Sequence, residues 1–154
     1  MKFRYDTYCG LYCGACDVII ANEKGTVQET AQKWNMNPED IECHGCKSGI
    51  TAVYCKTCEI KQCAEKNEVE FCFHCKEYPC DLLVEFKSDE YPHHSAIFKN
   101  LDAIKEEGVL EWLDEQEKRW SCPECGTRFS WYTDVCKKCG SNLYNCKAEE
   151  KDIQ

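Results

Sequence analysis

The spacing of apolar residues predicts two consecutive helices in the second half of the chain. Residues 95–108 carry an apolar stripe at helical spacing, formed by Ile97, Leu101 and Ile104 with Phe98 beside it. Gly108 is suited to end this helix, because glycine readily adopts the backbone conformation of a helix terminus. Residues 109–120 repeat the pattern, and their inward side chains are expected to be Val109 or Leu110, Leu113 and Trp120. The glutamates on the other side of this segment indicate a solvated face.

Four shorter helices are predicted in the first half of the chain. They cover residues 14–24, 26–34, 58–66 and 79–86, the first with Val18, Ile19 and Ile20 as its apolar side. The second begins with a capping-box pattern, in which Thr26 is followed three residues later by Glu29, and it ends before Pro38. Strands are expected only near the end of the chain, in the segments RFSWYT (128–133) and NLYN (142–145).

The fold class that these elements predict is a small metal-stabilised α+β protein. It would combine short helices and cysteine knuckles with a helical connector and a C-terminal zinc-ribbon β-hairpin. Such short elements bury little apolar surface, so bound metal is expected to supply much of the stability. The cysteine distribution predicts a cysteine-rich multi-metal domain (1–93), the connector (94–120), the zinc ribbon (121–147) and a tail (148–154).

The 16 cysteines among 154 residues indicate either disulfide bonds or metal sites. Lys2 and Arg4 are followed by Asp6 and not by the apolar stretch of about 7 to 15 residues that a secretion signal needs. We therefore expect a cytoplasmic protein with reduced thiols. Six cysteine pairs also have the two-residue spacing that lets two thiolates face one ion. The sequence thus favours metal over disulfides.

The formal net charge of −9 bears on the partners. Metal held by four thiolates makes the chain more negative still, and such a surface repels nucleic acids and anionic membranes. We therefore expect no nucleic-acid partner and no membrane partner, and a protein as the binding partner.

The surest metal site lies in the segment CPECGTRFSWYTDVCKKCG. Two Cys-x2-Cys pairs, each followed by glycine, predict two knuckle turns that share one ion, with the ligands Cys122, Cys125, Cys136 and Cys139. The segment resembles a zinc ribbon over about residues 120–146, and rubredoxin-like iron is the alternative. Four protein ligands leave no open position, so a structural role is expected. Cys146 is left over as a free thiol.

The first half of the chain holds eleven cysteines whose pairing the sequence leaves open. Their spacing repeats with a shift of 17 residues, and consecutive pairing gives two sets, Cys43, Cys46, Cys55 and Cys58, and Cys63, Cys72, Cys75 and Cys80. A third set, Cys9, Cys13 and Cys16, is then one ligand short. Cys63 is the first candidate for the missing ligand, followed by Cys80 or a histidine. The repeat also allows the sites to interleave.

Three motifs together carry a family resemblance: YCGL (8–11), the block from Cys55 to Ala64, and EYPC (77–80). On them, residues 5–90 resemble the cysteine-rich domain-of-unknown-function family 3795. The resemblance implies a metal-binding domain, usually taken as zinc-binding, with no assigned activity. The spacing of Cys9, Cys13 and Cys16 is also that of radical S-adenosylmethionine enzymes, but about 90 residues are too few for their barrel.

The function predicted from these observations is a zinc-binding protein with three or four structural ions, acting as a binding or scaffolding module. An iron–sulfur or mononuclear-iron redox protein is the alternative. A third reading is a metal-dependent enzyme with an open position at the Cys9, Cys13 and Cys16 group. No side chain is singled out as catalytic. His44 and His74 are expected at the surface, and His93 and His94 at a helix entrance.

Overall fold

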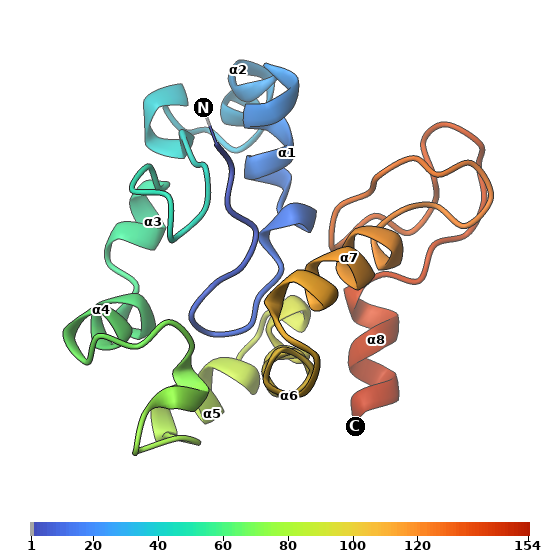
Figure 1. Ribbon diagram of the computed structural model, residues 1–154. Coiled ribbons are helices and arrows are strands. Elements are labelled where there is room, and N and C mark those ends of the chain that lie inside the picture. Colours follow the sequence, from blue (N-terminus) through green and yellow to red (C-terminus); the bar gives the residue numbers. More distant parts are fainter. Residues whose placement is uncertain (1) are drawn as a thin grey trace.

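The computed structural model describes residues 2–154, and over this range all of its regular elements are helical (Figure 1). The α-helices are α1 (Asp17–Lys24), α2 (Val27–Lys33), α3 (Val53–Lys56), α4 (Glu59–Lys66), α5 (Asp81–Lys87), α6 (Ile97–Glu107), α7 (Val109–Arg119) and α8 (Cys146–Ile153). Four short 3-10 helices connect them, namely η1 (Cys13–Ala15), η2 (Pro38–Ile41), η3 (Cys72–His74) and η4 (Pro92–His94).

The predicted α+β class, with its C-terminal zinc-ribbon β-hairpin, is wrong. Residues 2–154 contain no strand, and pairing is limited to two isolated antiparallel bridges, Ser121 with Arg128 and Val135 with Asn142. The reason lies in the partners of the expected strand at residues 128–133. Phe129 donates to the Trp120 carbonyl, whereas Trp131 donates to Ala15 and accepts from Cys146. Backbone groups that pair with separate segments cannot form a continuous ladder.

The helices that the apolar pattern predicts are present, with shifts at their ends. Within α7 the predicted inward face is confirmed, because Val109 and Leu113 pack against the buried core and Trp120 is 4% exposed. Trp112 is buried beside them at 1% exposure, whereas Leu110 is 80% exposed. The predicted capping box is wrong, since the Thr26 side chain makes no capping hydrogen bond. Helix α8 was not expected; it begins just after the predicted strand at residues 142–145 and covers most of the residues assigned to the tail. Its N-cap, Asn145, accepts hydrogen bonds from two amides of the first turn, those of Lys147 and Ala148.

Two clusters of buried apolar residues hold the chain together. The smaller, here called the minor core, packs α1, α2 and η2 around Val18, Ile19 and Ile41. The larger, here called the main core, gathers residues from the N-terminal segment through to α8, such as Leu101 and Trp112. It crosses the predicted boundaries near residues 93 and 120, although the division into domains itself stays a prediction.

The N-terminal segment runs through the middle of the molecule, between α3 and α4 on one side and α6 and α7 on the other (Figure 1). The Arg4 amide donates to the His44 carbonyl at 2.7 Å, and the Tyr8 carbonyl accepts from Cys72 at 2.9 Å. Further on, the Asn100 side chain donates to the Gly10 carbonyl at 2.9 Å. This segment therefore joins the middle of the chain to helix α6.

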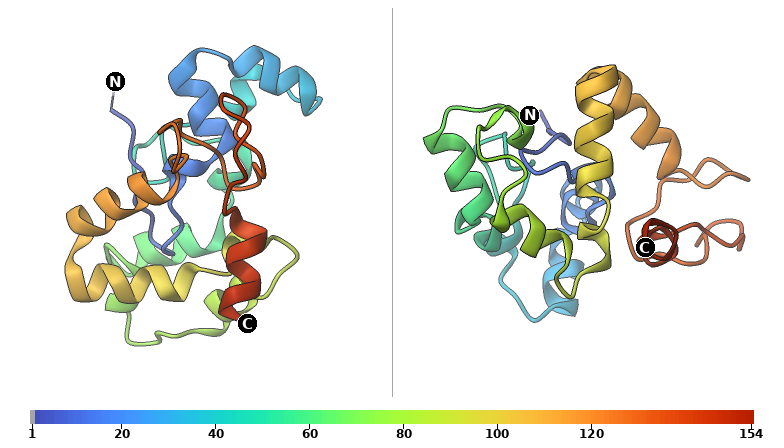
Figure 2. Two further views of the ribbon diagram at one scale, coloured as in Figure 1. Left: turned by 90° about the vertical axis from the view of Figure 1, so that its right-hand side faces the viewer. Right: turned by 90° about the horizontal axis from the view of Figure 1, so that it is seen from below.

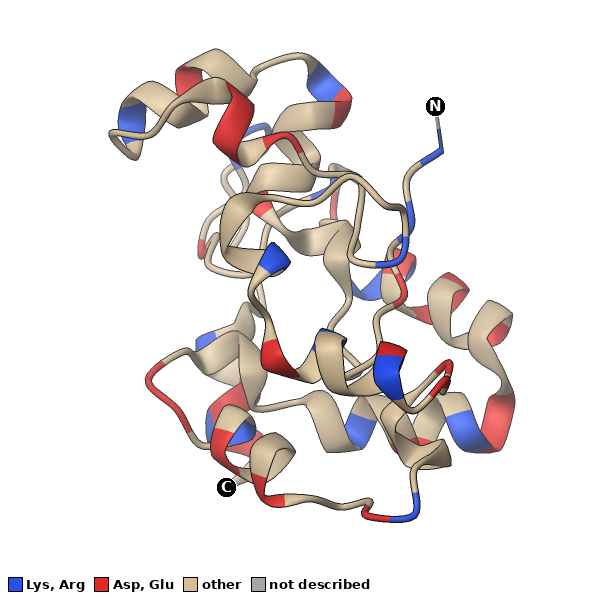
Figure 3. Ribbon diagram, turned by 90° about the vertical axis from the view of Figure 1, so that its left-hand side faces the viewer, with Lys and Arg blue, Asp and Glu red and all other residues tan. Residues whose placement is uncertain are grey.

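Helix α8 packs against η4, and the two loops that precede it project from one side of the helical body (Figure 2). Acidic and basic positions are scattered over the helices and loops of the side shown in Figure 3. In the described part of the chain, no helix has both the length and the apolar character needed to cross a membrane.

Candidate metal centres

The C-terminal cysteine pairs form a compact group of four thiols. The sulfur atoms of Cys122, Cys125, Cys136 and Cys139 all lie within 4.8 Å of one another. Cys122 and Cys139 are 3.6 Å apart, as are Cys125 and Cys136. A tetrahedral ion with metal–sulfur bonds of about 2.3 Å separates its sulfur ligands by about 3.8 Å. The group thus has the size that a single ion requires, and it could hold a metal.

Two nearly identical turns produce this arrangement. In the first, the Gly126 amide donates to the Cys122 carbonyl at 2.8 Å, and in the second, the Gly140 amide donates to Cys136 at 2.9 Å. The φ angles of these glycines are +76° and +77°, a region that residues with a side chain rarely adopt. Glycine after each cysteine pair therefore has the role that the sequence predicted, and local hydrogen bonds place the sulfur atoms.

Hydroxyl groups beside two of the sulfur atoms favour the thiolate form. Cys125 Sγ lies 3.1 Å from the Thr127 hydroxyl, and Cys139 Sγ lies 3.2 Å from the Ser141 hydroxyl. These contacts lower the pKa of Cys139 and lower the pKa of Cys125 to about 6. Thiolates, and not thiols, bind metal. Sequence reasoning missed both hydroxyl groups, although each lies two residues after the second cysteine of a pair.

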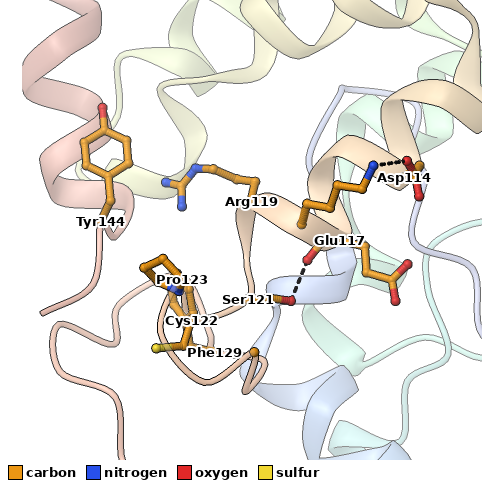
Figure 4. A pocket seen from close by; sticks show the side chains of 10 residues that line it. Asp114, Glu117, Arg119, Ser121, Cys122, Pro123, Phe129 and Tyr144 are labelled. Atoms are coloured by element: carbon orange, nitrogen blue, oxygen red, sulfur yellow. Dashed lines mark hydrogen bonds and ion pairs between the residues drawn. The ribbon is translucent and has the colours of Figure 1, made fainter. Parts of the chain in front are cut away.

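A pocket of about 650 Å³ lies beside the first knuckle, between α7 and Tyr144 (Figure 4). The Arg119 guanidinium lies 3.9 Å from the Trp120 ring and 4.8 Å from the Tyr144 ring. Its Nε is 3.6 Å from a Glu149 carboxylate oxygen. Arg119 thus packs α7 against the end of the chain.

The N-terminal cysteines form no group as compact as the C-terminal one. All sixteen cysteines belong to the described residues, and each is a free thiol. Within residues 2–154, the C-terminal set is the one group of at least three potential ligand atoms that all lie within 4.8 Å of one another. The metal sites expected at Cys9, Cys13, Cys16, Cys43, Cys46, Cys55, Cys58, Cys63, Cys72, Cys75 and Cys80 therefore stay a prediction.

One predicted N-terminal set nevertheless surrounds a common space. A cavity of about 30 Å³ is lined by four cysteines together with apolar side chains of α4 and α5, and these cysteines are Cys63, Cys72, Cys75 and Cys80. Asn67 also lines it, with its amide nitrogen 3.5 Å from Cys63 Sγ. The volume is small, about enough for one water molecule or one ion. The structure thus places around one cavity the four cysteines that consecutive pairing assigns to a single site.

Burial keeps many of the N-terminal thiols protonated when no metal is bound. It raises the pKa of Cys16 to about 11 and the pKa values of Cys46, Cys55 and Cys72 to about 12. Burial is also the main cause that raises the pKa values of Cys9 and Cys13. Binding of metal at neutral pH would therefore release protons here.

The histidines divide between buried packing and the surface. His74 is exposed, as predicted. His44 is buried and stacks on Phe3 with ring centroids 4.4 Å apart, so the prediction that His44 lies at the surface is wrong. His93 Nδ1 lies 2.7 Å from the Tyr132 hydroxyl. Burial lowers the pKa of His93 to about 3, so this ring is neutral at pH 7. The His93 contact ties η4, just before α6, to the segment that contains Tyr132.

The fold and the site define a helical, cysteine-rich protein with one preformed group of four thiols that could hold a metal ion. A family model described as "Protein of unknown function (DUF3795)" matches residues 5–85. Because this match spans more than half of the 154 residues, the chain belongs to that family. The C-terminal thiol group lies outside the matched range. No curated protein and no solved structure matches the chain.

Proposed function

We propose that the protein is a zinc-binding module whose metals are structural and which presents its surface to a protein partner. The observation that carries the proposal is the C-terminal group of four sulfur atoms, two pairs of which are 3.6 Å apart. Zinc has no geometric preference of its own and adopts the tetrahedral arrangement that four thiolates impose. A site closed by four protein ligands stabilises the fold and leaves no position for a substrate.

The negative charge and the cysteine chemistry support the rest of this proposal. A net charge of −9 disfavours binding to nucleic acids, so a protein is the partner we propose. Sixteen free thiols are suited to a reducing compartment, and we propose the cytoplasm.

The test is a metal count on anaerobically purified full-length protein. We expect three or four zinc ions per chain in the unmodified protein, and one fewer in Cys136→Ser, because that variant lacks one of the four C-terminal ligands. Cys146→Ser is the matched control, since Cys146 is equally buried but lies outside the group. It should retain every ion. An unmodified protein with no metal, or a Cys136→Ser variant with an unchanged count, would contradict the proposal.

A second candidate function is iron–sulfur binding in the N-terminal region. The supporting observation is that no three sulfur atoms of the described N-terminal cysteines lie within 4.8 Å of one another. A cluster of several irons holds its thiolates farther apart than a single ion does. Iron–thiolate centres absorb visible light and zinc centres do not, so the spectrum of an anaerobic sample separates the two. A colourless protein with zinc in every site would exclude the iron alternative.

A further inference from the structure

A small cavity lies where α4, η3 and the start of α5 meet, on the far side of the molecule from the C-terminal loops (Figure 1). Its volume is about 30 Å³, and its walls include the side chains of Cys63, Cys72, Cys75 and Cys80. The other walls are mainly apolar, and Ile60, Ala64 and Leu83 among them are each at most 4% exposed. Sulfur is therefore the chemistry that this space offers, and thiolates favour zinc and other soft or borderline metal ions.

The four cysteines of this cavity are held to different degrees. Cys72 and Cys80 pack against the main core, whereas Cys63 is exposed on α4. The Cys75 amide donates to the Cys72 carbonyl at 3.1 Å, which closes the turn between these two residues. Cys80 is the N-cap of α5, but its side chain makes no capping hydrogen bond, so its sulfur is free to bind a metal ion. Packing and a local turn therefore hold three of the cysteines, and the fourth, Cys63, is the exposed one.

The side chain of Asn67 provides a hydrogen-bond donor beside the exposed sulfur atom. Its Nδ2 donates to the Cys63 carbonyl at 2.8 Å and lies 3.5 Å from Cys63 Sγ. A side-chain amide nitrogen carries two hydrogens, so one can hold the group on the carbonyl while the other faces the sulfur. Hydrogen bonds from residues outside the ligand set orient metal ligands and tune the metal. Asn67 is thus placed to position Cys63 as a ligand.

The surroundings of the cavity argue against a different use of Cys63, as the missing ligand of the early group Cys9, Cys13 and Cys16. Among the described residues that line the cavity, none belongs to that group. Cys13 and Cys16 pack against the minor core, whereas Leu83 in the cavity wall belongs to the main core. Cys63 therefore faces the cysteines that follow it in the chain and not those of the N-terminal segment.

We propose that Cys63, Cys72, Cys75 and Cys80 bind one zinc-class divalent ion in this cavity, with Asn67 as the positioning residue of Cys63. The inference rests on the proposed zinc-binding function and adds a second site to the C-terminal one. The cavity has room for a single ion, whereas a cluster of several irons needs more space. Because the four sulfur atoms do not all lie within 4.8 Å of one another, binding must draw them together. The bound ion would then join α4 to η3 and α5.

Paired cysteine variants of the full-length protein test this site by their metal content. Cys63→Ser and Cys75→Ser should each contain one ion fewer than the unmodified protein. The double variant should also contain one ion fewer, because both residues hold the same ion, and Cys146→Ser should retain every ion. If the double variant lost two ions, Cys63 would belong to another site, and the inference would be overturned. An unchanged count in either single variant would overturn it as well.

A measurement on the unmodified protein covers the case in which a variant fails to fold. The protein is loaded with cadmium-113, and each cadmium signal is correlated by NMR with the β protons of the cysteines that bind it. We expect one signal shared by all four cysteines of the cavity. If the C-terminal cysteines shared a signal and the cavity cysteines did not, the inference would fail while the proposed function stood. A protein that bound no metal at all would contradict both.

The role of Asn67 has its own readout in the same experiment. Asn67→Ala should shift the cadmium signal that correlates with Cys63 and leave the C-terminal signal in place. It should also lower the affinity of the cavity site by about 10-fold or more, measured by competition with a chelator. Asn37→Ala is the matched control, since Asn37 is also exposed and its side chain contacts Asp40. A Cys63 signal that stayed unchanged in Asn67→Ala would overturn the positioning role.

Discussion

The two cysteine-rich regions of this protein prepare their thiols in opposite ways. In the C-terminal group, local backbone hydrogen bonds position four sulfur atoms at the spacing of a single ion, and neighbouring hydroxyls favour two thiolates. In the N-terminal region, most of the cysteines lie in or against the hydrophobic clusters, and burial favours the protonated form of several of them, such as Cys13 and Cys55. The comparison shows that local turns position one set of thiols at the spacing of a single ion, whereas the positions of the other set depend on the packing of distant segments.

The largest expected effect contrasts one glycine from each region. Gly45→Ala should lower the free energy of unfolding by more than about 4 kcal/mol or prevent folding, because the new Cβ would meet the Arg4 carbonyl oxygen at 1.9 Å. Gly126→Ala should cost only about 1–2 kcal/mol, the strain of its positive φ, since a Cβ there meets no atom within 4 Å. Urea unfolding of the metal-loaded proteins measures both. Equal losses would show that the two regions depend equally on packing.

A smaller effect is expected where the two regions touch. Arg128 Nε donates to the Gly14 carbonyl at 2.7 Å, and Nη1 contacts the Glu23 carboxylate. Arg128→Ala should lower the free energy of unfolding by about 1–2 kcal/mol, because the carbonyl loses its donor while partial exposure weakens the ion pair. Lys118→Ala is the control, since its ion pair with Asp114 is exposed to solvent and should contribute little to the free energy of unfolding. If Arg128→Ala and Lys118→Ala lowered the free energy of unfolding equally, Arg128 would not couple the two regions.

The smallest effect leaves the fold unchanged and appears only in thiol reactivity. In metal-free protein, alkylation of Cys125 should be near its maximum at pH 7 and should fall as the pH drops below about 6, its pKa. Alkylation of Cys55 should instead keep rising toward pH 12, because burial raises its pKa to about 12. Peptide mapping by mass spectrometry after brief treatment with iodoacetamide measures both rates. If the alkylation rates of Cys125 and Cys55 changed with pH in the same way, the proposed difference between the two regions would be contradicted.

Local patterns in the sequence predicted the helices and the C-terminal thiol group well. Apolar spacing located α6 and α7, and two Cys-x2-Cys-Gly repeats identified four sulfur atoms that the structure brings together. These features depend on residues close in the sequence, whose geometry is set by the turns between them.

Features that depend on distant partners were not predictable in this way. The segment around Trp131 has strand-forming residues, but its amide pairs with Ala15, more than a hundred positions earlier. The apolar pattern of α7 likewise does not reveal that the N-terminal segment packs against Trp112. Tyr12 provides that contact, with its ring centroid 6.0 Å from the Trp112 ring.

The path of the N-terminal segment through the middle of the molecule has a consequence for biosynthesis. Gly10, Gly14 and Ala15 leave the ribosome well before their partners Asn100, Arg128 and Trp131. At about 5–20 residues per second, Gly14 is made about 6 to 23 seconds before Arg128. The cysteines of this segment therefore emerge as unprotected thiols, and the main core closes only after Cys146 has been made.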